Sequence, residues 1–411
     1  MPLGWLASGT GVFLGIAGLA LGLGRIICGH LLDDCGSAAR PWLSVTTGLA
    51  AMTALVFAIG AIKCFSVPVT TVCLGLAAAV VTVVMSQRRA WLHQIGSDLR
   101  AANSDAARDA PWIWPGIAII GLVAMGAALA PEVRGDSLIY HISAAMLFVV
   151  HAGHVEIPSS ALTYIPQNQQ LLYALALLFD GDTAARLLHL LCGVLLAVGT
   201  VASARLLGMS RCDGMVSVLL LLTVPTWLYL ATSTYVDLAV ANYSLACLYC
   251  LLVARRNGST GWTVLAAVMA GMAMGCKYTA GVVLTAPAMI LAAAPARGGT
   301  GAGAAVRRAM LFATLSFLVL APWLIRNFIW TGNPVAPSLM GLLGPPGVPP
   351  STVNWPDVQP GNPALFLQPI ALLASVAQMY ISFLDYGNFL PCLLYTSDAA
   401  DDLLCVDLGG R

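Results

Sequence analysis

Long runs of apolar residues dominate the chain, separated by short segments that carry the helix breakers and most of the charges. Many runs approach about 20 residues, the length at which an α-helix crosses the ~30 Å hydrocarbon core of a bilayer. The runs therefore predict an all-α polytopic membrane helical bundle of about eleven spans. The predicted spans are residues 3–24, 42–62, 67–86, 112–130, 184–204, 214–232, 237–254, 260–275, 279–294, 309–325 and 364–384.

The apolar stretch from Gly261 to Ala294 is longer than one span requires. As a single helix it would measure about 50 Å and overrun the bilayer. The basic residue Lys277 interrupts the stretch. We therefore predict a break at Lys277 and two spans rather than one.

Two segments are too polar or too irregular to cross the membrane. The first covers about residues 131–182 and contains amphipathic stretches at 139–151 and 170–179, which predict helices lying along the membrane surface. The second, residues 330–362, is rich in glycine and proline and predicts a loop.

Composition and charge narrow the class of protein. Hydrophobic residues make up 59% of the chain and charged residues 9%, far below the ~25% of soluble domains. The net charge of +1 gives no sign of a nucleic-acid partner.

The basic residues also predict the orientation, because cytoplasmic loops are enriched in lysine and arginine. With the N-terminus outside, thirteen arginines are cytoplasmic: Arg25, Arg40, Arg88, Arg89, Arg100, Arg108, Arg205, Arg211, Arg255, Arg256, Arg297, Arg307 and Arg308. Five basic residues remain outside: Lys63, Arg134, Arg186, Lys277 and Arg326. An asymmetry of this size means that the outer cations need a reason to be there.

Four ionisable residues are predicted at the ends of spans on the outer face: Asp136, Asp237, Lys277 and Arg326. Ionisable groups near membrane depth are costly and therefore mark functional sites. Two carboxylates and two cations suit a reaction in which an acceptor hydroxyl loses a proton while an anionic leaving group departs. Each residue also has a structural alternative, since the aspartates can cap helices and the cations can extend to lipid headgroups.

Two weaker patterns could bind a divalent metal ion. One combines His141, His151 and His154 with Glu156, and the other is Asp180-Gly181-Asp182. For the histidines an interfacial role without a metal is favoured, and for the aspartates a turn in which Asp182 caps the next span. The chain contains no nucleotide-binding or zinc-protease fingerprint, so ATP-driven pumps, dinucleotide enzymes and zincins are excluded.

Several motifs resemble those of bacterial GT-C-fold membrane glycosyltransferases, relatives of protein O-mannosyltransferases, aminoarabinose transferases and rhizobial galacturonosyltransferases. The resemblance covers roughly residues 112–337. The motifs that carry it are Gly135-Asp-Ser-Leu-Ile-Tyr-His141, Tyr164-Ile-Pro166, Asp237, Gly275-Cys-Lys-Tyr-Thr279, Ala321-Pro-Trp-Leu-Ile-Arg-Asn327 and Trp330-Thr-Gly-Asn-Pro334.

The resemblance implies a polyprenyl-phosphate sugar donor, inversion at the anomeric carbon, and an active site on the extracytoplasmic side of the inner (plasma) membrane. The acceptor stays open among lipid, glycan and protein. Asp136 would accept or orient the acceptor proton, and Asp237 would be a second acid near the sugar or a cation. Lys277 and Arg326 would bind the donor phosphate.

Second-tier contacts to donor or acceptor would come from Tyr140, His141 and Asn327. The family often carries an acidic pair at the first-loop motif, whereas Asp136 has Arg134 and Ser137 as neighbours. Dependence on a divalent cation is therefore left open.

The sequence predicts three parts. Residues 1–111 form a three-span region with a cytoplasmic linker, and residues 112–390 form the GT-C-like catalytic module. Residues 391–411 resemble translated sequencing-adapter read-through, which predicts a non-native tail and a protein truncated at its C-terminus.

Two rival functions stay open besides the glycosyltransferase, namely a lipid or lipid-linked-sugar transporter and a non-catalytic membrane subunit. A transporter would show broken helices and internal repeats, of which only the break at Lys277 is evident.

Overall fold

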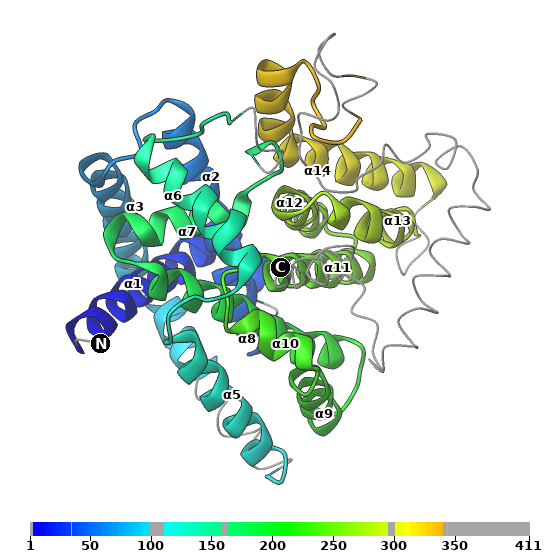
Figure 1. Cartoon of the computed structure of the whole chain (residues 1–411). Helices are drawn as coiled ribbons and strands as arrows, with labels where there is room; N and C mark the ends of the chain where they lie inside the picture. Colours follow the sequence, from blue (N-terminus) through cyan, green and yellow to red (C-terminus); the bar gives the residue numbers. More distant parts are fainter. Residues whose placement is uncertain are drawn as a thin grey trace, which may run out of the picture. The chain divides into compact units, whose positions relative to one another are not determined.

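The computed structural model describes residues 3–33, 35–98, 111–157, 163–294, 301–339 and 343, and every regular element within them is a helix (Figure 1). The predicted all-α class is confirmed. The elements are α1 (Leu3–Cys28), η1 (Gly29–Leu32), α2 (Ala39–Ala61), α3 (Val67–Gln87), α5 (Trp114–Ala128), η2 (Ser137–His141), α6 (Ile142–Val150), α7 (Asn168–Phe179), α8 (Asp182–Leu206), α9 (Arg211–Leu222), α10 (Pro225–Ala231), α11 (Asp237–Asn257), α12 (Thr260–Cys276), α13 (Thr279–Ala293) and α14 (Ala302–Thr331).

Ten of the eleven predicted spans coincide with helices, and the eleventh, 364–384, lies outside the described residues. Among the described helices, six are long and apolar enough to cross a membrane: α1 with η1, α2, α3, α8, α11 and α14. The pair α9 and α10, bent by 74°, could form a seventh span. The total of eleven stays a prediction.

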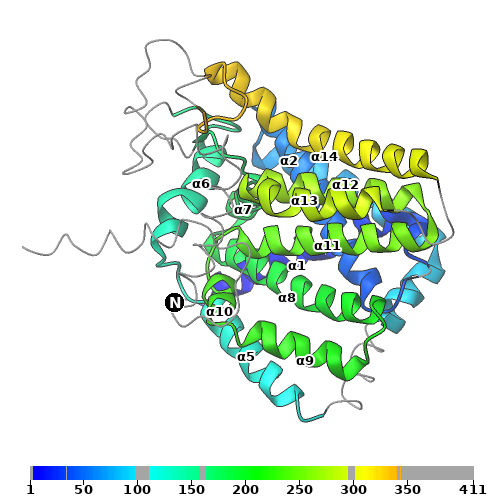
Figure 2. The same ribbon diagram turned by 90° about the vertical axis from the view of Figure 1, so that its right-hand side faces the viewer.

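The described residues divide into two compact units. One contains the described residues up to 155 and from 166 to 322, and the other contains residues 156–157, 163–165, 323–339 and 343. In the first unit, α1 packs on α2, and α11 packs against α8, α12 and α13 (Figure 2).

Glycines let α1 and α2 approach closely. A Cβ atom at Gly24 would lie 1.7 Å from the Ser44 carbonyl oxygen, and one at Gly48 would lie 1.8 Å from the Ala20 carbonyl oxygen. Small residues at such crossings are typical of helices that pack in membranes, where close backbone contact stabilises association.

The predicted break at Lys277 is present. Helix α12 ends at Cys276, Lys277 has extended dihedral angles (φ −156°, ψ 127°), and α13 begins at Thr279. Both helices pack against α11.

The two amphipathic stretches of the first outer segment also form helices, but they differ in burial. Helix α6 keeps apolar side chains such as Met146 and Val150 exposed, as expected for a surface helix. Helix α7 is buried along Asn168–Ala176, where it packs against α2, α6 and α8. Its polar first turn is therefore inside the unit rather than in solvent.

Candidate active site

Asp237 and Lys277 meet at one end of the α11–α12 hairpin. Only two residues separate α11 from α12, so the helices run antiparallel and the start of one lies beside the end of the other (Figure 2). Lys277 Nζ lies 3.4 Å from Asp237 Oδ1, and the side chains are 20% and 11% exposed. A pair so weakly hydrated interacts more strongly than one in water.

Asp237 does not cap its own helix. The capping position of α11 is Val236, which makes no side-chain capping bond, and Asp237 is the first helical residue. The backbone N–H of Leu238 donates instead to His189 Nε2, at 3.3 Å. His189 thus satisfies one N–H group of the helix start, and the Asp237 carboxylate pairs with the Lys277 ammonium.

His189, which the sequence reading overlooked, fixes the start of α11. Its Nδ1 lies 2.9 Å from the Leu230 carbonyl oxygen and 2.8 Å from that of Ser233. Carbonyl oxygens only accept, so Nδ1 carries the proton and Nε2 is the acceptor for Leu238. A fully buried histidine within an apolar span was the signal that could have revealed this role.

Glu132, also overlooked, joins the first outer segment to the turn before α11. One carboxylate oxygen accepts from the Val133 and Arg134 backbone N–H groups, both at 3.0 Å. The other accepts from the Ser137 hydroxyl and the Thr234 backbone N–H, both at 2.8 Å. The loop that carries Asp136 is thereby held beside the loop that leads to Asp237.

Asp136 immediately precedes η2, a π-helical turn. Its side chain is partly exposed and makes no capping hydrogen bond, so the capping interpretation finds no support. The hydrogen bonds of the adjacent Ser137 place the start of η2 at the turn before α11.

His141 ends η2 and is buried against Tyr235, with ring centroids 5.6 Å apart. Its Nδ1 lies 2.9 Å from Gln170 Nε2 on α7. Burial lowers the pKa of His141 well below 6.5, and the positive charge of Lys277 lowers the pKa further. His141 is therefore a neutral group within electrostatic reach of Lys277. The neighbouring Tyr140 ring lies 4.0 Å from the His141 ring and is partly exposed.

Arg326 and Asn327 belong to the other unit. The Arg326 guanidinium lies over the rings of Trp323, at 4.5 Å, and Trp330, at 4.6 Å. It donates to the Ile165 carbonyl oxygen at 3.2 Å and to Asn327 Oδ1 at 2.8 Å. These contacts give Arg326 a definite role in holding its own unit together.

Asn327 continues this network through its side-chain amide, which donates to the carbonyl oxygens of Tyr164, at 2.7 Å, and Ala336, at 3.0 Å. The Tyr164 hydroxyl donates to Glu156 at 3.0 Å. Burial, together with this bond to Glu156, raises the pKa of Tyr164 to about 12. Of the four ionisable residues singled out in the sequence, Asp136, Asp237 and Lys277 are in the first unit and Arg326 is in the second.

Neither weak metal pattern forms a metal centre in the part of the chain that the structure describes, where no three His, Cys, Asp or Glu side chains are grouped for an ion. The His154 ring packs against Phe57 and Phe148, with centroids 4.5 and 5.0 Å away. Asp182 pairs with Arg186 one turn later in α8 and accepts from the Glu132 backbone N–H at 3.3 Å. The predicted cap is not formed, because Gly181 occupies the capping position of α8 and Asp182 is its first helical residue. The contacts of His154 and Asp182 stabilise the fold locally.

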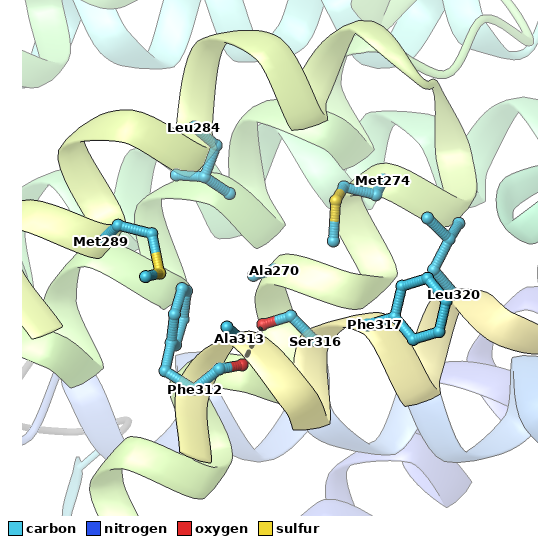
Figure 3. A pocket seen from close by; sticks show the side chains of 9 residues that line it. All are labelled: Ala270, Met274, Leu284, Met289, Phe312, Ala313, Ser316, Phe317 and Leu320. Carbon is cyan, nitrogen blue, oxygen red and sulfur yellow. Dashed lines mark hydrogen bonds between the residues drawn. The ribbon is translucent and has the colours of Figure 1, made fainter. Parts of the chain in front are cut away.

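An apolar pocket of about 180 Å³ lies between α12, α13 and α14 (Figure 3). Its lining is Ala270, Met274, Leu284, Met289, Phe312, Ala313, Ser316, Phe317 and Leu320. The Ser316 hydroxyl donates to the Phe312 carbonyl oxygen of its own helix at 2.7 Å, so the lining offers mainly hydrocarbon and sulfur.

Residues 169–326 match the family described as dolichyl-phosphate-mannose-protein mannosyltransferase. The resemblance to GT-C-type membrane glycosyltransferases is confirmed. The matched segment contains Asp237, Lys277, Arg326 and His189 and begins after Asp136. Searches of curated proteins and of solved structures gave no match. The matched segment is thus similar to membrane glycosyltransferases of the GT-C type, and the described helices include several that are long and apolar enough to cross a membrane.

Proposed function

We propose that the protein transfers a sugar from a polyprenyl-phosphate donor to an acceptor hydroxyl, with inversion, on the extracytoplasmic face of the inner (plasma) membrane. The observation that carries the proposal is the weakly hydrated Asp237–Lys277 pair at the end of the α11–α12 hairpin, within the segment that matches a glycosyltransferase family.

The reaction needs a base on one side of the sugar and a cation on the other. In a single displacement, the acceptor oxygen attacks the anomeric carbon while the bond from that carbon to the phosphate oxygen breaks. Asp136 accepts the acceptor's proton, and the ammonium of Lys277 stabilises the charge on the departing polyprenyl phosphate. Asp237 orients Lys277 through their 3.4 Å contact and presents a second acidic group to the sugar.

The donor's chemistry explains why the site belongs to a membrane protein. Each buried CH₂ group of a lipid anchor contributes about 0.8 kcal/mol, so a polyprenyl tail stays in the bilayer and its phosphate stays at the interface. The apolar pocket suits such a tail, and one of its lining residues, Met274, lies three residues before Lys277.

The remaining predicted contacts enter the proposal as secondary groups. Tyr140 and His141 follow Asp136 in η2 and would contact donor or acceptor. For Arg326 and Asn327 the family resemblance implies contacts to the donor, and the hydrogen bonds that the structure gives them lie within their own unit. A divalent cation is not required by the steps assigned to these residues.

The test is a transfer assay with purified protein in lipid nanodiscs and a panel of radiolabelled polyprenyl-phosphate sugars. We expect wild-type protein to release polyprenyl phosphate and glycosylate an acceptor, and Asp136→Asn to bind donor without transfer. Movement of fluorescent lipid-linked sugar across vesicles that persists in Asp136→Asn, with no transfer by wild type, would favour the transporter instead.

A further inference from the structure

A group of buried polar atoms beside Lys277 has no hydrogen-bonding partner among the described residues. The atoms are Nε2 of His141, Oε1 of Gln170 and Oε1 of Gln169. The three side chains are only 1–2% exposed. Buried polar atoms without partners are destabilising, so several of them in one place call for a ligand or water that satisfies them.

Two elements bring these atoms together. Asn168, at the start of α7, donates to the Met272 carbonyl oxygen on α12 at 3.1 Å, which docks the first turn of α7 on the helix that ends at Lys277. The contact is close because Gly275 has no side chain, since a Cβ atom there would lie 2.1 Å from Asn168 Nδ2. The second element is η2, which carries His141. It is π-helical, and π-helical turns are frequent at functional sites.

His141 and Gln170 form a hydrogen-bonded pair, and the geometry of their contact shows which atoms can still donate or accept. Gln170 Nε2 donates to Nδ1 of the neutral His141, so Nε2 of His141 carries the proton. The pair then offers one unused donor, His141 Nε2–H, and one unused acceptor, Gln170 Oε1. If the Gln170 amide is turned over, the two roles exchange but one donor and one acceptor remain.

Gln169 precedes Gln170 in the first turn of α7. Its amide N–H group is close enough to the Tyr173 hydroxyl to act on it as a hydrogen-bond donor, whereas its Oε1 atom has no partner. Gln169 therefore supplies a further acceptor.

We propose that His141, Gln170 and Gln169 form a binding site for hydroxyl groups of the donor sugar. A hydroxyl group donates one hydrogen bond and accepts another, so it can use both the free donor and the free acceptor of the His141–Gln170 pair. An anionic group only accepts hydrogen bonds and would be repelled by the free acceptor. The location fits as well, because Lys277 would hold the phosphate to which the sugar is attached. This inference rests on the proposed function.

The experiment compares donors that differ in one hydroxyl. Wild-type protein and Gln170→Met are assayed in nanodiscs with the preferred polyprenyl-phosphate sugar and its deoxy and epimeric analogues. Loss of hydrogen bonds to one hydroxyl should lower kcat/KM for the preferred donor by about 10- to 100-fold and leave the analogues nearly unchanged. Competition by polyprenyl phosphate without sugar should be unaffected, since the phosphate contact remains.

Gln169→Met provides a second variant should Gln170→Met fail to fold, and Trp227→Phe is the matched control. Trp227 has an equally buried, unpartnered indole N–H outside this group, so its replacement should leave the preference between donors unchanged. If the folded glutamine variants transfer sugar with unaltered preference, the hydroxyl site is wrong and the proposed function stands. If wild-type protein transfers no sugar from any donor, the proposed function fails first.

Discussion

Replacing Lys277 by methionine separates its structural role from its chemical one. At the Nζ–Oδ1 distance of 3.4 Å and an effective dielectric constant of about 20, the attraction to Asp237 amounts to about 5 kcal/mol before desolvation is counted. Removing one partner of a buried pair typically costs roughly 3–5 kcal/mol. Because both side chains keep some contact with solvent, we expect the free energy of unfolding to fall by about 3 kcal/mol, the lower end of that range.

Lys277→Met should lower the rate of sugar transfer by more than its lower stability explains. A preorganised group that stabilises a developing oxyanion contributes about 10²–10³-fold to kcat. Lys277→Met should therefore lower kcat by that factor at temperatures where the variant is folded. The double variant Lys277→Met/Asp237→Asn removes both charges, so it should regain most of the stability and none of the activity.

Both quantities are measurable on the same nanodisc preparations. Reaction with a thiol-reactive dye above the level set by the exposed Cys64 reports thermal unfolding, because Cys192, Cys247, Cys250 and Cys276 are buried. Transfer from polyprenyl-phosphate sugar reports kcat. Lys63→Met is the matched control, since Lys63 is an exposed lysine of the same unit that donates to the His154 carbonyl oxygen, and its loss should leave transfer unchanged. A double variant that regains the wild-type rate would show that Lys277 has no part in the chemistry.

Three further predictions concern the residues around the pair. Asp136→Asn should abolish transfer while donor binding, measured by competition, stays within about twofold of wild type, and a normal rate would rule out Asp136 as the base. Glu132→Gln places an amide N–H₂ among donors that need an acceptor, so the free energy of unfolding should fall by about 1–3 kcal/mol, with Glu132→Asp nearer wild type in thermal unfolding. Because the lowered pKa of His141 keeps it neutral while the unfolded chain binds a proton below about pH 6.5, the free energy of unfolding should decrease as the pH falls through that value. His141→Gln should flatten this dependence in unfolding curves recorded between pH 7.5 and 5, and an unchanged slope would contradict it.

The length and spacing of the apolar runs were sufficient to predict most helices. The length of the apolar stretch and the position of one cation also predicted the break at Lys277, because an uninterrupted helix there could not fit a bilayer. The bend between α9 and α10 was missed. It occurs where Val224 is extended before Pro225, since proline disfavours a helical conformation in the preceding residue and lacks the N–H that would continue the ladder.

The site could be predicted only in part. Asp237 and Lys277 were identifiable because charges at the ends of spans are rare, and a helical hairpin brings them to one end. Glu132 was not identifiable in this way, because its function depends on hydrogen bonds to Thr234, distant in the sequence. The burial of Gln169 likewise depends on α6, α8 and α2 covering α7, and a polar first turn alone favours solvent.

The most direct test of the central claim is an electron cryomicroscopy structure of the protein in nanodiscs with a polyprenyl-phosphate sugar. The proposal predicts density for the phosphate within hydrogen-bonding distance of Lys277 Nζ, with the Asp136 carboxylate facing the anomeric carbon from the opposite side. Phosphate density away from Lys277, or Asp136 and Lys277 too far apart to contact the same sugar phosphate, would contradict it.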